Sequence, residues 1–164
     1  MSTIQYQTQT QPYTRIERSL SEHVIQSSLV QIVRCLERKY APLALLYAIP
    51  NGGDRHKVVA GKLKAEGVRR GVPDLHLPVS RGEYHSLYIE MKTCSGRLSA
   101  EQRNRRELLV NEGNAYVVCR TLNEGLSVLG MYLNLSSDNK SLPESFFRIN
   151  TTPIPTWGLH YFGM

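Results

Sequence analysis

Apolar residues recur at two distinct periods along the chain, and the first of these periods is helical. In residues 19–40, apolar side chains lie three and four positions apart: Val24, Ile25, Leu29, Ile32, Val33 and Leu36. This spacing is typical of a helix that packs one face against a core. Ser19 and Glu22 have the spacing of a capping box, which predicts that the helix begins there. Residues 1–18 lack any period and are predicted to form a flexible tail.

The second period is that of a β-strand. Residues 87–92 alternate strictly, so their apolar residues point to one face of a strand, and Glu90 and Lys92 are neighbours on the other. Three further apolar runs predict strands: residues 43–49, 75–77 and 115–119. The run at 43–49 is nearly continuous, which is typical of a buried strand, and the Pro-Asn-Gly-Gly that follows predicts a tight turn.

Three more helices are predicted, at residues 54–66, 99–111 and 121–133. Gly67 is placed to end the first helix. The other two begin with capping-box sequences, Ser99 to Gln102 and Thr121 to Glu124. The resulting order of helices and strands predicts an α/β domain over residues 19–134, with a mixed central sheet flanked by helices. Residues 135–164 are predicted to be a linker and a C-terminal extension.

Candidate chemistry lies where two of the predicted strands meet. Asp74 directly precedes the run at 75–77, and a turn at residues 81–83 predicts that this run pairs antiparallel with the strand that carries Glu90. Asp74, Glu90 and Lys92 are therefore expected to converge at one end of the sheet. Two carboxylates hold a hard divalent cation, and an ammonium beside them steers an attacking water or a phosphate.

Basic charge surrounds this candidate site. The chain carries a net charge of +6, and residues 55–106 alone contain twelve lysines and arginines against five acidic residues, an excess of +7. Such a concentration of positive charge is what a protein needs to bind a phosphate backbone. The sequence has no apolar run approaching the roughly 20 residues that span a membrane, and no signal peptide core.

The cysteines and histidines predict no further metal site. Cys35, Cys94 and Cys119 have neither zinc nor disulfide spacing and are expected to be reduced thiols, with Cys35 and Cys119 in the core. The five histidines have no ligand spacing either. His76 is predicted to be an ordinary strand residue that faces away from the carboxylates.

The stretch around the candidate site resembles a known family. Residues 67–75 read GVRRGVPDL, Glu90-Met91-Lys92 follows, and then come Gly96, Ser99 and Gln102. This arrangement resembles the VRR-NUC branch of the PD-(D/E)XK nuclease superfamily, in its stand-alone phage and bacterial form, and the resemblance covers about residues 20–134. It implies a restriction-endonuclease-like core and a deoxyribonuclease that depends on Mg²⁺ or Mn²⁺.

The resemblance also implies roles for particular residues. Asp74, Glu90 and the backbone carbonyl of Met91 would hold the metal ion, and oxygen-only ligation favours Mg²⁺ or Mn²⁺ over zinc. Lys92 would act as a base or as an electrostatic clamp on the phosphate. Four arginines are candidates for holding DNA phosphates: Arg69, Arg70, Arg97 and Arg106.

Two polar residues have both a structural and a functional interpretation. Glu22 is either the partner in the first capping box or a third acidic residue near the metal, because the family has a glutamate at the start of this helix. Gln102 caps its helix, and the family carries a glutamine there that faces the active site. For Gln102 the two roles are compatible.

The resemblance leaves the substrate open. A short stand-alone domain suggests a Holliday-junction-resolvase-like endonuclease that acts as a homodimer on branched DNA, because two symmetric strands must be cut. The alternatives are a flap or repair nuclease, a restriction-type nuclease, and a DNA-binding module with a silent nuclease site. The expected location is the cytoplasm of a bacterial cell or phage-infected host, with no membrane association.

Overall fold

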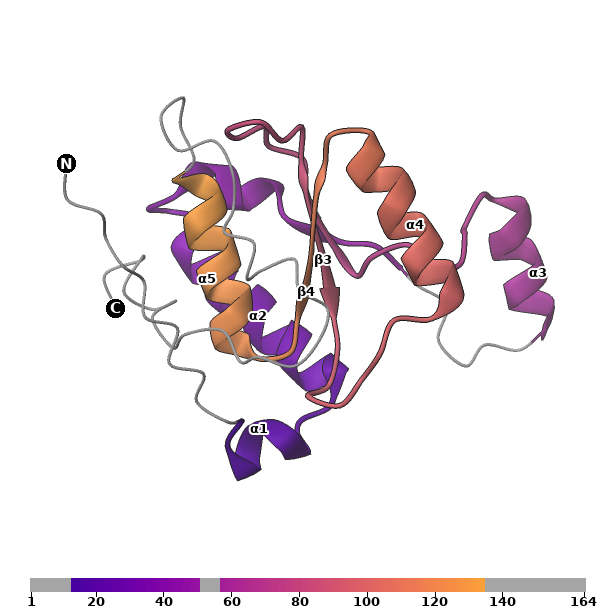
Figure 1. Cartoon of the computed structure of the whole chain (residues 1–164), viewed down its shortest axis with the longest axis horizontal. Helices are drawn as coiled ribbons and strands as arrows, with labels where there is room; N and C mark the ends of the chain where they lie inside the picture. Colours follow the sequence, from indigo (N-terminus) through magenta and orange to yellow (C-terminus); the bar gives the residue numbers. More distant parts are fainter. Residues whose placement is uncertain (1–12, 51–56, 135–164) are drawn as a thin grey trace.

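The computed structural model describes residues 13–50 and 57–134, which form a four-stranded mixed sheet flanked by helices (Figure 1). The strands lie in the order β1 (Tyr47–Ala48), β2 (Leu75–Leu77), β3 (Leu87–Met91) and β4 (Ala115–Cys119). The first three are antiparallel neighbours, whereas β3 and β4 are parallel. The prediction of an α/β fold with a mixed central sheet is confirmed.

The hydrophobic core lies between one face of the sheet and two helices, α2 (Glu22–Leu36) and α5 (Leu122–Leu133) (Figure 1). The two helices approach closely at Gly125, where an added Cβ would lie 2.7 Å from Leu29. Helix α4 (Ala100–Asn111) connects β3 to β4 on the opposite side of the sheet. Strand β3 is therefore covered on both faces, and only Tyr88 among its residues is not buried.

The first long helix begins two residues later than predicted. Its N-cap is Ser21, whose hydroxyl accepts a hydrogen bond from the amide of Val24, so the capping box proposed for Ser19 and Glu22 is wrong. Ser19 instead ends a short helix, α1 (Arg15–Ser19), that Thr14 caps. The flexible tail predicted up to residue 18 thus includes a helical turn, and residues 1–12 lie outside the described residues.

The apolar run at residues 43–49 is not a buried strand, and this prediction is wrong. Residues Ala41–Leu45 form a 3₁₀ helix, η1, which has proline in its first turn, and the strand that follows has only two residues, both exposed. Proline fixes a helical φ and provides no N–H for a sheet, so η1 replaces the first half of the strand. The run still contributes Leu43 to the core. All of the predicted glycine turn except Pro50 lies outside the described residues.

The remaining helices agree well with the sequence patterns. Helix α3 (Lys57–Ala65) is followed by Gly67 at a positive φ of 95°, as predicted. The capping box at the start of α4 is complete, with reciprocal bonds between Ser99 and Gln102. Thr121 caps α5, but the carboxylate of Glu124 does not return to it. The predicted extension at residues 135–164 lies outside the described residues.

Cysteine burial follows the prediction only in part. Cys119 of β4 is buried, whereas Cys35 of α2 is exposed and was wrongly expected in the core. Cys35 does not belong to the buried stripe of α2, which consists of Ile25, Leu29, Val33 and Leu36. In the part of the chain that the structure describes, no helix combines the length and hydrophobicity needed to cross a bilayer.

The approach of Gly71 to helix α4 provides a test of the fold. Gly71 has a φ of +76°, and an added Cβ would lie 2.5 Å from the backbone oxygen of Glu101. Gly67 also has positive φ, but nothing lies within 4 Å of its Cβ position. We expect Gly67→Ala to cost about 1–2 kcal/mol for backbone strain alone, and Gly71→Ala to cost about 1–3 kcal/mol more because of the overlap. Urea unfolding of both variants measures the difference, and equal losses would contradict the described packing.

Candidate active site

The antiparallel hairpin of β2 and β3 brings the two predicted carboxylates together. Leu75 pairs with Ile89 and Leu77 with Leu87, a register that places Asp74 opposite Glu90. The turn closes through reciprocal backbone hydrogen bonds between Arg81 and Tyr84, at 3.1 and 2.9 Å. The sequence-based prediction that these two strands form an antiparallel hairpin is therefore correct.

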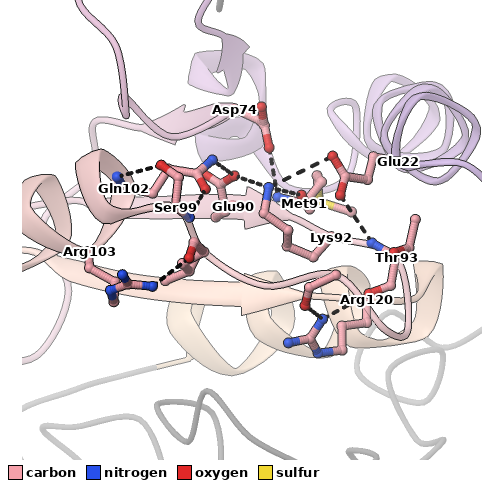
Figure 2. Close-up of polar contacts among 12 residues, drawn as sticks. Glu22, Asp74, Glu90, Met91, Lys92, Thr93, Ser99, Gln102, Arg103 and Arg120 are labelled. Carbon is pink, nitrogen blue, oxygen red and sulfur yellow. Dashed lines mark hydrogen bonds and ion pairs between the residues drawn. The ribbon is translucent and has the colours of Figure 1, made fainter.

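Asp74 is held between the two neighbouring strands. Its carboxylate accepts a hydrogen bond from the amide of Met91 at 2.8 Å, and its backbone carbonyl accepts one from the amide of Ile49 at 2.8 Å. Figure 2 shows the Asp74 side chain directed at the end of β3, beside Glu90 and Lys92. The half-buried carboxylate is thereby fixed at the edge of the site.

Glu90 is the most enclosed charged group of the site, with 0% exposure. Its Oε1 accepts hydrogen bonds from the ammonium of Lys92 at 2.6 Å and from the amide group of Gln102, and its Oε2 from the Tyr116 hydroxyl at 3.4 Å. The pKa of Glu90 is raised to about 7, first by burial and then by the charge of Asp74, although Lys92 opposes the rise.

Lys92 connects the buried glutamate to the N-terminus of α2. Its Nζ lies 3.2 Å from the carbonyl oxygen of Met91 and 3.7 Å from a carboxylate oxygen of Glu22. Glu22 also accepts a hydrogen bond from the amide of Thr93 at 3.2 Å. Of the two interpretations of Glu22, the capping box is excluded by the position of Ser21, and Glu22 lies beside the lysine (Figure 2).

Gln102 has both of the predicted contacts at once. Its side-chain oxygen accepts from the amide of Ser99 at 2.9 Å, which closes the capping box, and its Nε2 donates to Glu90. The oxygen of the Gln102 side-chain amide therefore caps helix α4, and its nitrogen binds Glu90 in the site. Figure 2 shows this residue between the start of α4 and Glu90.

The four candidate DNA-binding arginines lie on three separate segments. Arg69 and Arg70 are exposed between α3 and β2, and Arg97 is exposed between β3 and α4. The pKa of Glu101 is lowered first by hydrogen bonds at the start of α4 and then by Arg70, so Arg70 lies near this helix. Arg106 is half-buried on α4.

The sequence analysis assigned no role to Tyr116 and Arg120. Tyr116 faces the site because it lies beside Tyr88 in the parallel pairing of β3 and β4. Arg120 follows β4, and its guanidinium donates to the carbonyls of Thr93 and Gly96, both at 2.8 Å. It thereby holds the loop that follows Lys92 (Figure 2). Neither residue belongs to a motif, so only the strand pairing could have indicated them.

His76 was wrongly expected to face away from the carboxylates. It pairs with Tyr88, and both side chains lie on the sheet face that carries Glu90, because Leu75, Leu77, Leu87 and Ile89 occupy the core face. Alternation along β2 places Asp74 and His76 on the same side. The two-residue alternation from Asp74 is therefore enough to fix the side to which His76 points.

The oxygen donors of the site suit a hard divalent cation. No group of three His, Cys, Asp or Glu side chains within the described ranges could hold a metal ion. A cation here would therefore combine the carboxylates of Asp74 and Glu90 with the carbonyl of Met91, which already faces the Lys92 ammonium. Carboxylates, a backbone carbonyl and water are the ligand set that Mg²⁺ accepts. The repulsion between Glu90 and Asp74 also favours a cation between them.

Comparison with known proteins identifies the family. The sequence model of the VRR-NUC domain matches residues 4–122, so the chain belongs to the VRR-NUC domain family. A solved structure named VRR_NUC domain protein is 27% identical, with a TM-score of 0.64 over 76% of this chain and 98% of that chain. No curated protein matches. The family implies a nuclease-type function, with DNA as the substrate, and nucleases of this kind are typically metal-dependent.

The enclosed charge of Glu90 is costly to the fold, although it would serve to bind a metal ion. Removing this charge should therefore stabilise the metal-free protein. Glu90→Gln keeps the shape and the acceptor for Lys92, and it removes both the cost of burying the charge and the repulsion from Asp74, which together outweigh the attraction to Lys92. The variant should therefore unfold at a higher temperature than the wild type without metal, by about 2–4 °C for each kcal/mol gained.

The pH dependence of this gain has a defined sign. The pKa of Glu90 rises from 4.5 when unfolded to about 7 in the folded protein, so the wild type loses stability as the pH rises from 4.5 to 7. The advantage of Glu90→Gln should be absent below pH 4.5, grow between these values and stay constant above pH 7. Thermal unfolding in EDTA measures it, and a variant less stable than the wild type at pH 8 would contradict the electrostatic assignment.

Proposed function

We propose that the protein is an endonuclease that hydrolyses phosphodiester bonds in branched DNA with Mg²⁺ or Mn²⁺, in the manner of a Holliday junction resolvase. The single observation that carries the nuclease mechanism is the enclosed Glu90 carboxylate, positioned opposite Asp74 and 2.6 Å from the Lys92 ammonium. A buried carboxylate in this surrounding is costly to the fold, which makes a functional role the best account of it.

Each group of the site has a proposed part in hydrolysis. Asp74, Glu90 and the Met91 carbonyl would hold a divalent cation, which would supply activation of a water and neutralisation of charge on the phosphate. Lys92, aligned by Glu90 and Glu22, stabilises the phosphorane that forms, because its ammonium faces the same oxygens. Gln102 and Tyr116 orient the Glu90 carboxylate by donating to its two oxygens.

The metal and the three central residues are tested together. Asp74→Ala, Glu90→Ala and Lys92→Ala should each lower the cleavage rate at least 100-fold, a loss on the scale of removing one electrostatic contact to the transition state. Glu101→Gln, at an exposed acidic position on α4, is the matched control and should cleave normally. Rates are measured with Mg²⁺, Mn²⁺ or EDTA. Undiminished cleavage in EDTA would refute the metal-dependent mechanism.

The preference for branched DNA rests on the resemblance to stand-alone resolvase-like domains and needs its own assay. A four-way junction, a flap, a linear duplex and a single strand are compared as substrates, and light scattering measures the oligomeric state with and without the junction. We expect paired incisions in the junction by a homodimer, because one site per chain reaches one strand. Preferential flap cleavage would favour a repair nuclease, and cleavage at a fixed sequence a restriction-type enzyme. Tight binding without any cleavage would favour the silent DNA-binding module.

Neutralisation of the arginines tests the path of the DNA backbone. Arg69→Gln with Arg70→Gln should weaken DNA binding and lower the slope of log K against log salt by about one unit for each phosphate that the variant no longer neutralises. Arg34→Gln with Arg38→Gln is the charge-matched control, because both residues are exposed and lie in or just after α2, a helix on the opposite side of the sheet from α4. Equal slopes for the two double variants would show that Arg69 and Arg70 contact only solvent.

A further inference from the structure

Four aromatic rings lie side by side across the whole sheet, one from each strand. Tyr47 of β1 pairs with His76 of β2, His76 with Tyr88 of β3, and Tyr88 with Tyr116 of β4. Directly paired residues point to the same face of a sheet, so the rings form one row. We call these four residues the aromatic row. It lies on the face of the sheet opposite the core.

The rings of Tyr47, His76 and Tyr88 contact one another in a defined arrangement. The hydroxyl of Tyr47 and Nδ1 of His76 form a hydrogen bond at 2.6 Å, with the rings edge to face at 81° and centroids 5.3 Å apart. His76 and Tyr88 are stacked, with centroids 4.2 Å apart and planes within 6°. The rings are therefore held in fixed positions, and side chains fixed in this way lose little entropy when they receive a ligand.

The aromatic row runs from solvent to the active site. Tyr47 is 51% exposed at the edge of the sheet, and His76 and Tyr88 are half-buried. Tyr116 is buried at the other end and donates to Glu90. The neighbouring pair on the same face is Asp74 and Glu90, two residues or roughly 7 Å further along the strands.

Core packing does not account for the solvent end of this row. A side chain that serves only the core would be enclosed, as Tyr116 is, whereas half of Tyr47 is accessible. His76 adds a polar atom that needs a partner, because its Nε2 is buried and has no hydrogen-bond partner among the described residues. An exposed ring on the sheet face that carries Asp74 and Glu90 matches the chemistry of unpaired nucleic acid, which stacks its bases on aromatic side chains.

We propose that Tyr47, backed by His76 and Tyr88, is a stacking site for an unpaired base of the DNA strand whose phosphate lies at Asp74 and Glu90. This inference rests on the proposed nuclease function, and it adds the contact by which the protein would select its DNA substrate. A base in a continuous duplex is stacked on its neighbours and cannot reach the sheet edge. Bases that unpair at a branch point, as when a pair opens at the centre of a four-way junction, or that lie in a gap or at a strand end can do so, and such DNA is therefore preferred.

The proposal is tested by binding of the full-length protein in EDTA, where cleavage is absent. The probes are a single strand and a gapped duplex that carry 2-aminopurine in the unpaired region, together with a continuous duplex. Because Tyr47→Ala removes one base–aromatic stack, we expect it to bind the single strand and the gapped duplex about ten-fold more weakly and the continuous duplex equally well. Quenching of the 2-aminopurine fluorescence should disappear as well.

Two matched variants separate stacking from other effects. Tyr47→Phe keeps the ring and should retain the affinity for unpaired DNA. Leu45→Ala removes a similarly exposed apolar side chain two residues earlier and should change nothing. The proposal is overturned if Tyr47→Ala binds all three probes like the wild type, if it weakens all three equally, or if the wild type binds no unpaired DNA.

The same protein preparations distinguish failure of this inference from failure of the nuclease function. If the wild-type protein quenches 2-aminopurine through Tyr47 but cleaves no DNA with any metal, the stacking site is supported and the nuclease function is refuted. If the protein cleaves with Mg²⁺ but Tyr47→Ala prefers the same substrates as the wild type, the nuclease function is supported and the stacking site is refuted.

Discussion

The enclosure of the Glu90 charge is the constraint on which the rest of the site depends. A carboxylate with no exposure to water is tolerated only where donors and cations replace the lost hydration. Lys92 supplies the charge from the position directly after β3, Gln102 an amide from the first turn of α4, and Tyr116 a hydroxyl from β4. Helix α4 and strand β4 therefore both contribute directly to this one group.

The parts of the site that depend on local sequence could be predicted. The strict alternation of residues 87–92 predicted that Glu90 and Lys92 lie on the same side of the chain. The short turn before β3 predicted that the neighbouring antiparallel strand is the one next to Asp74. The Ser99–Gln102 box was equally readable, because both of its hydrogen bonds span three residues. In each case the determining interaction is close in sequence, so the pattern of residues contains it.

The predictions that failed depend on competition or on distant partners. Two serines near the start of α2 are both suitable caps, and only the earlier turn around Thr14 decides in favour of Ser21. His76 is the exception, because its two-residue separation from Asp74 already places it on the side of the carboxylates. Tyr116 and Arg120 reach the site only through the parallel pairing of β4, which carries no local signal. Membership of the VRR-NUC family supports the nuclease class but does not fix these contacts.

The long sequence separations within the site have a consequence for how the protein folds. Tyr116 and Glu90 are 26 residues apart, and Glu22 and Thr93 are 71 residues apart. Closing such loops costs chain entropy before any contact compensates, so contacts of this kind form late and together. A nascent chain that has already emerged as far as Lys92 still lacks Gln102 and Tyr116. The enclosure of Glu90 is thereby coupled to completion of the fold, because two of its three donors belong to segments that follow Lys92.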